Sequence, residues 1–124
     1  MGKFVIKPAK NGIMFNLKAG NSQVIATSEV YSKEAACRKG IASVQKNAPI
    51  ANLEDQTEEE PKTFSNPKFE LYQDKAGKFR FRLKARNGQI IAVSEAYEAK
   101  KSALNGIESV RKNAADGEIV KEEA

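Results

Sequence analysis

The side chains with the most evident capacity for chemistry are five cations that alternate along one short segment. They are Lys78, Arg80, Arg82, Lys84 and Arg86. Because apolar residues fill the positions between them, this period of two predicts a β-strand with all five cations on one face. Neighbouring cations would stand about 6.5–7 Å apart, close to the phosphate spacing of a nucleic-acid strand. The segment predicts either an anion-binding or nucleic-acid-binding face, or a solvated sheet face that charges keep soluble.

Three other features each allow a functional and a structural interpretation. Ser-Glu-x-Tyr recurs at 28–31 and 94–97, where it forms either a polar pocket or a strand-to-helix junction. Gly40 and Gly106 fall within predicted helices and indicate a close approach to a neighbouring element rather than a ligand cradle. Cys37 is either a reactive thiol or a small core residue. We favour the structural interpretation for all three.

The composition excludes several classes of enzyme. The chain has no histidine and a single cysteine, so it lacks the commonest general base and cannot assemble a zinc site. Nucleophile pairs of the Ser-His and Cys-His type are excluded as well. We therefore predict no catalytic, cofactor-binding or metal-binding residues. The expected function is a non-enzymatic binding or interaction module of unknown ligand; the alternative is weak electrostatic nucleic-acid binding through the five cations.

The elements that must position these residues follow from an internal repeat. Comparing the sequence with itself at an offset of 66 gives 17 identities in the 32 pairs that begin with Leu17 and Leu83. Before Ile13 the offset becomes 65, so the second copy has one extra residue in its first turn. A unit of about fifty residues buries little surface alone. We therefore expect the two copies to share one core.

Each copy has the same predicted order of three strands, one helix and a short fourth strand. The strands are expected at 4–7, 13–19 and 24–28, and at 69–73, 79–85 and 90–94, with hairpin turns at Asn11-Gly12 and Asn87-Gly88. Ser32 is the expected N-cap of a helix that runs to about Asn47. Two apolar stripes face the core: Cys37, Ile41, Val44 and Ala48, and Ala103, Ile107, Val110 and Ala114. Leu53 and Ile119 mark the fourth strands.

Charge is distributed unevenly along the chain. The predicted organisation is repeat 1 at 1–53, an acidic linker at 54–67 and repeat 2 at 68–121. Positions 54–60 carry −5 and positions 116–124 carry −3 against +5 for the whole chain, which leaves +13 on the rest. A body this basic attracts polyanions without specificity. The acidic segments are candidates to cover the basic strand.

The chain is expected to be cytoplasmic and monomeric. It contains no apolar run of about eighteen residues, and its first eleven residues do not resemble a signal peptide. With one cysteine it forms no internal disulfide, which fits a reducing compartment. No membrane contact is predicted, and the macromolecular partner is unknown.

The sequence resembles the YegP-like family of small bacterial tandem-repeat proteins of unknown function. The resemblance lies in FELYQDKAGKFRFRLKARNGQIIA, SEAY and NGIESVRKNA of the second copy, and more weakly in the first copy. It implies an α+β fold in which two βββα(β) repeats form one antiparallel sheet, with helices on one face and C-terminal strands exchanged between repeats. The chain would then be a monomeric pseudo-dimer.

Overall fold

The computed structural model describes residues 2–122 and contains three strands before the first helix. They are β1 (Lys3–Ala9), β2 (Gly12–Lys18) and β3 (Val24–Thr27), followed by α1 (Glu34–Asn47), a 3-10 turn η1 (Ala48–Ile50) and β4 (Asn52–Asp55). Repeat 2 gives β5 (Lys68–Gln73), β6 (Phe79–Lys84), β7 (Ile90–Val93), α2 (Lys100–Ala114) and β8 (Glu118–Lys121). Both fourth strands are confirmed, and β4 includes Glu54 and Asp55 of the acidic segment.

The eight strands form one sheet in the order β4-β5-β6-β7-β3-β2-β1-β8. The strand that follows each helix pairs with the first strand of the other repeat, β4 with β5 and β8 with β1. This confirms the α+β class and the strand exchange. The predicted all-antiparallel sheet is corrected to a mixed one, because both exchanged strands run parallel to their partners, whereas the six inner strands are antiparallel.

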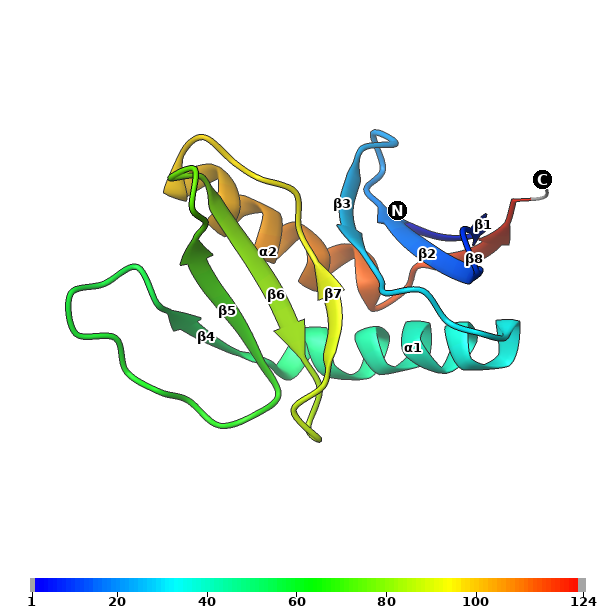
Figure 1. Ribbon diagram of the computed structural model, residues 1–124, viewed down its shortest axis with the longest axis horizontal. Helices are drawn as coiled ribbons and strands as arrows, with labels where there is room; N and C mark the ends of the chain where they lie inside the picture. The colour runs from blue at the N-terminus through cyan, green and yellow to red at the C-terminus, as the bar shows by residue number, and fades with distance from the viewer. Residues whose placement is uncertain (1, 123–124) are drawn as a thin grey trace.

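Both helices lie on one side of the sheet, with β4 and β8 at its two opposite edges (Figure 1). Each helix packs against strands of both repeats: α1 contacts β2 and β7, and α2 contacts β6, β2 and β3. Polar contacts cross in the same way, since Arg111 donates to the Ala48 carbonyl at 3.1 Å and Gln45 donates to the Gly117 carbonyl at 3.3 Å. The helices therefore connect the two repeats through donors at equivalent positions, Gln45 and Arg111.

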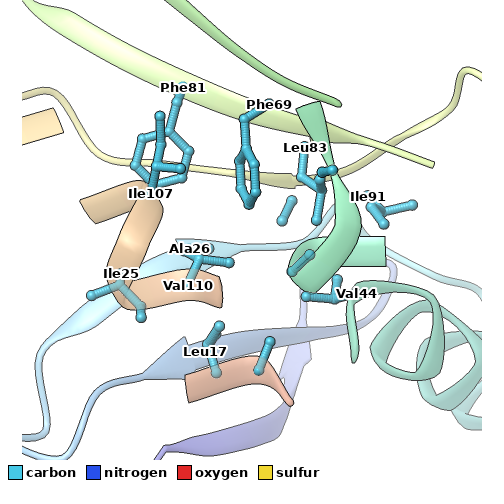
Figure 2. Packing of buried hydrophobic residues seen from close by; sticks show 14 of the residues in the cluster. Leu17, Ile25, Ala26, Val44, Phe69, Phe81, Leu83, Ile91, Ile107 and Val110 are labelled. Carbon is cyan, nitrogen blue, oxygen red and sulfur yellow. The ribbon is translucent and has the colours of Figure 1, made fainter. Parts of the chain in front are cut away.

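The core is a single cluster built by both repeats. Alternation along the strands points Phe4, Phe15, Phe69 and Phe81 toward the helices, and all four are at most 1% exposed. The predicted apolar stripes of both helices are fully buried against them. Figure 2 shows Phe69, Phe81 and Leu83 of repeat 2 in one cluster with Leu17 and Ile25 of repeat 1. The expectation of a shared core is confirmed.

Two local predictions are wrong in detail. The first hairpin turns at Lys10 and Asn11 rather than at Asn11 and Gly12, since Ala9 pairs with Gly12 and only Asn11 has a positive φ. Gly12 is required for a different reason: a Cβ there would lie 2.2 Å from the Tyr31 carbonyl oxygen.

The start of α1 differs as well. Its N-cap is Lys33, which has an extended backbone and makes no side-chain capping bond. Ser32 is one residue too early in the chain for its hydroxyl to take that role.

Candidate functional site

The five predicted cations lie on β6 and just beyond its ends, and four of them are held in ion pairs. Arg80 Nε lies 2.8 Å from Asp74 Oδ2, Arg82 Nε lies 2.5 Å from Glu70 Oε1, and Lys84 Nζ lies 3.3 Å from Glu70 Oε2. Lys78 pairs with Glu98. Arg86 follows β6 in the hairpin to β7 and has no ion pair within 4 Å among the described residues. The face of β6 is thus largely neutralised.

The centre of this face is a cluster of mutually paired charges that we call the charged network. Its members are Glu54, Lys68, Glu70, Arg82 and Lys84. Cross-strand register places Glu70 opposite Arg82 and Lys68 opposite Lys84, while the parallel pairing of β4 sets Glu54 beside Glu70. Glu54 and Glu70 are 4% and 3% exposed. Carboxylates this buried need cationic partners, and each has them.

The pKa shifts in the charged network follow from those contacts. Burial alone would raise the pKa of Glu54, but hydrogen bonds from Lys68, Gln56 and the Phe64 N–H outweigh it and set the pKa at about 2. Burial likewise opposes the lowering of the Glu70 pKa, which Arg82 and Lys84 cause. The hydrogen bond to Glu54 raises the pKa of Lys68 despite burial. All three groups therefore stay charged at neutral pH.

Tyr72 stands on the same face of β5. Its ring carries the Arg82 guanidinium, whose Cζ lies 4.7 Å from the ring centroid. The cation–π contact adds to the ion pair that Arg82 makes with Glu70. Both the ring and the cation are thus already engaged within the protein.

The partner acids could have been found in the sequence. Glu70 alternates with apolar residues along its strand, so it lies on the same face as Lys68 and Tyr72. Once this strand pairs with β6, the residue opposite Glu70 on that face is one of the β6 cations. The linker contributes through its first two residues, since Glu54 pairs with Lys68 and Asp55 with Lys100. Among the described residues, the ion pairs of β6 come from β5, the following turn and Glu98 rather than from the linker.

The equivalent face of repeat 1 has different chemistry. Val5 of β1 corresponds to Glu70, Asn16 of β2 to Arg82, and Val120 of β8 to Glu54. Val5 and Asn16 are nearly buried, and Asn16 Oδ1 has no hydrogen-bond partner. The same backbone arrangement therefore accepts either a charged network or two valines and an asparagine flanked by Lys3 and Lys18.

The recurring Ser-Glu-x-Tyr segments form strand-to-helix junctions, as the structural interpretation predicted. The Phe15 N–H donates to Ser28 Oγ at 2.9 Å, and the Ser28 hydroxyl donates to the Glu29 carbonyl. Ser94 makes the same two bonds in repeat 2. The Tyr31 ring stacks on Phe15 at a centroid distance of 6.4 Å. Burial, followed by the Glu29 charge, raises the pKa of Tyr31.

Gly40 and Cys37 are explained by packing. A Cβ on Gly40 would lie 2.3 Å from Tyr31 Oη, and Gly106 is in the same relation to Tyr97 at 2.7 Å. Cys37 is fully buried, and that burial raises the pKa of its thiol. Within residues 2–122 there is no group of three or more His, Cys, Asp or Glu side chains that could hold a metal ion. The same range contains no helix with the length and apolar character needed to span a membrane.

The family model, the related sequences and the solved structures that resemble this chain all point to the same family. Residues 9–55 and 74–120 match the family model described as "Domain of unknown function (DUF1508)". A UPF0339 protein of Mannheimia succiniciproducens, MS1092, is 46% identical over 116 residues, which is 93% of this chain and 89% of that protein. The solution NMR structure of the Escherichia coli protein yegP, of unknown function, superposes with a TM-score of 0.80 at 34% identity, covering 99% of this chain and 94% of that one.

A shorter relative matches half of the molecule. A UPF0339 protein of Treponema denticola is 68% identical over 53 residues, which is 43% of this chain but 91% of that protein. A protein with essentially one repeat therefore exists beside those with two, as expected if the repeat is the unit from which the fold is built.

Proposed function

This chain belongs to the DUF1508 family of unknown function, and from that premise we propose that it is a non-catalytic binding module whose ligand is a polyanion. The proposal rests on what the charged side chains do in the fold. Many of the acids are held in ion pairs or lie in the linker, whereas many cations on the folded body have no ion pair in the part of the chain that the structure describes.

The observation that best supports polyanion binding is the excess of cations without an ion pair. Lys3, Lys7 and Lys18 on β1 and β2 have no ion pair within 4 Å among the described residues. Lys3 stands directly opposite Lys18 in the β1–β2 register, where like charges repel each other. An anion that neutralises both would relieve this repulsion. Together with the charge of +13 outside positions 54–60 and 116–124, this favours attraction of polyanions.

The state of the titratable groups argues against acid–base catalysis. A general acid or base works best with a pKa near the working pH. Here the shifts move away from neutrality: ion pairs lower the pKa of Glu54 and Glu70, and burial raises the pKa of Tyr31 and Tyr97. These groups are fixed in one protonation state, which supports binding rather than chemistry.

Nucleic acid is the polyanion that we propose to test. Labelled single-stranded and double-stranded DNA and RNA would be titrated at about 50 and 200 mM salt. We expect affinity in the micromolar range that falls steeply with salt. Absence of binding at the lower salt concentration would overturn the proposal and direct the search toward protein partners.

The same titration locates the surface. Arg80→Ala/Arg82→Ala removes two cations that are already neutralised by Asp74 and Glu70, so we expect it to bind almost as well as the parent. Loss of binding in that variant would instead assign the interaction to the face of β6, with its carboxylates displaced by phosphates.

A further inference from the structure

A trough runs along α1, between this helix and the β6–β7 hairpin of the other repeat. It consists of two adjoining hollows of about 340 and 240 Å³ that have Lys39, Ser43, Ala85 and Asn87 in common. Since these residues line both hollows, the two are continuous. We call this feature the α1 trough. Each repeat contributes one wall, so the trough exists only in the assembled pseudo-dimer.

Three cations line the α1 trough. Lys39 and Lys46 come from α1, seven residues apart and therefore about 10 Å along the helix axis. Arg86 comes from the hairpin wall. None of the three has an ion pair within 4 Å among the described residues. Glu29, at the Tyr31 end, is the one acid among the residues that line the two hollows. The lining thus has a net positive charge, from three cations against one acid.

The remaining lining combines small or apolar residues, such as Ala85 and Ile91, with a few polar ones. Asn47 is 4% exposed and lines the larger hollow. Its Nδ2 donates to the Ser43 carbonyl at 2.8 Å and lies 3.1 Å from Ser43 Oγ, while its Oδ1 has no hydrogen-bond partner. A buried acceptor left unpaired is unfavourable. Because this oxygen is buried and can only accept, it offers nothing to a phosphate, and the case for an anion site rests on the three cations.

The pseudo-symmetry of the molecule shows that the fold does not require Lys39 and Arg86. At the equivalent positions of repeat 2, Asn105 replaces Lys39 and Glu108 replaces Ala42, and Gly20 replaces Arg86 in the facing hairpin. Ser43 and Asn47 recur as Ser109 and Asn113, which make the same side-chain contacts. Lys46 also recurs, as Lys112, whereas Lys39 and Arg86 have no cationic counterpart in the other half of the molecule.

Building on the proposed function, we propose that the α1 trough is the binding site and that its ligand is single-stranded nucleic acid. The cations stand on two facing walls, so a thin extended strand can lie between them, with phosphates near Lys39, Lys46 and Arg86. A duplex would rest on the rims and reach fewer of them. Because the contacts are mainly to phosphates, the binding is expected to depend weakly on base sequence.

The test exchanges residues between repeats. Lys39→Asn/Arg86→Gly gives the α1 trough the residues of its counterpart at these two positions. Arg80→Ala/Arg82→Ala is a control with the same change in net charge. Anisotropy of fluorescein-labelled dT12 and of a 12-base-pair duplex would be measured with both variants and the parent, after circular dichroism has confirmed folding.

We expect at least about a tenfold loss of dT12 affinity in the trough variant, less than about threefold in the control, and a salt slope shallower by about 1.4 for two lost phosphate contacts. Equal losses in the two variants, or tighter binding of the duplex than of dT12 by the parent, would overturn the assignment of the trough. Failure of the parent to bind any nucleic acid would overturn the proposed function itself.

Discussion

Replacing Glu70 by valine tests whether the charged network contributes to the stability of the fold. Glu70 is 3% exposed and faces Arg82 at 2.5 Å, Lys84 at 3.3 Å and Lys68 at 3.4 Å. Removing one partner of a buried pair costs roughly 3–5 kcal/mol. Since the Arg82 and Lys84 side chains are 31% and 26% exposed, water takes over part of their solvation. We therefore expect Glu70→Val to lose about 2–3 kcal/mol of unfolding free energy.

Repeat 1 supplies the compensating change. The triple variant Glu54→Val/Glu70→Val/Arg82→Asn installs the residues found at the equivalent places in repeat 1, Val120, Val5 and Asn16. Replacing a buried charge cluster as a whole by residues that pack well is often neutral. Lys68 would turn outward to solvent, as the exposed Lys3 does. We expect the triple variant to lie within about 1 kcal/mol of the parent.

Urea unfolding followed by far-UV circular dichroism at pH 7 gives the midpoint and slope for each variant. Glu98→Gln serves as the control, because its carboxylate is 84% exposed and the pair with Lys78 should contribute at most about 1 kcal/mol. The reasoning is refuted if Glu70→Val unfolds like the parent, or if the triple variant is less stable than Glu70→Val alone.

Three further predictions concern packing, protonation and assembly. Gly40→Ala should destabilise the protein by about 1–3 kcal/mol in urea unfolding, although alanine has the better helix propensity, because the added Cβ would clash with Tyr31 Oη. Tyr31→Phe in the same chain should restore part of this loss. If it restores none, the contact with Tyr31 Oη is not the cause. The folded-state pKa of Glu54, about 2, lies below its ordinary 4.5, so its contribution to stability is complete above pH 4.5 and declines as the pH falls toward 2. Urea midpoints between pH 6 and pH 3 should therefore fall less in Glu54→Gln than in the parent, and equal declines would contradict the assignment. Repeat 2 expressed alone lacks β4 and a partner for β8, so light scattering should find a dimer or circular dichroism an unfolded chain; a stable folded monomer would contradict the need for strand exchange.

The sequence allowed the elements and the core to be predicted because both depend on local periodicity. Alternation along 79–85 fixed which side chains of β6 face the helices, and helical spacing identified the buried stripe through Ile41 and Val44. The identities between the two copies supported a shared architecture. Strand exchange followed from the family resemblance together with the apolar residues Leu53 and Ile119, which both lie in edge strands.

The state of the charges could not be predicted in the same way, because it depends on which strands become neighbours. Arg82 appears free in a one-dimensional pattern, yet Glu70 lies opposite it once β5 pairs with β6 in register. The α1 trough is harder still to foresee. Lys39 and Arg86 are 47 positions apart and meet only because α1 of one repeat packs beside the hairpin of the other.

Comparison of the two repeats separates residues that the fold requires from residues that it tolerates. Tyr31 and Tyr97, with the glycines they contact, recur because the helix and the junction could not otherwise pack. At other places one backbone environment holds very different side chains, as with Val5 and Glu70 or Lys39 and Asn105. Packing alone cannot explain a difference between copies that share a fold. Positions that diverge on the surface, and above all Lys39 and Arg86, which have no cationic counterpart in the other copy, are therefore where a function specific to this chain should be sought.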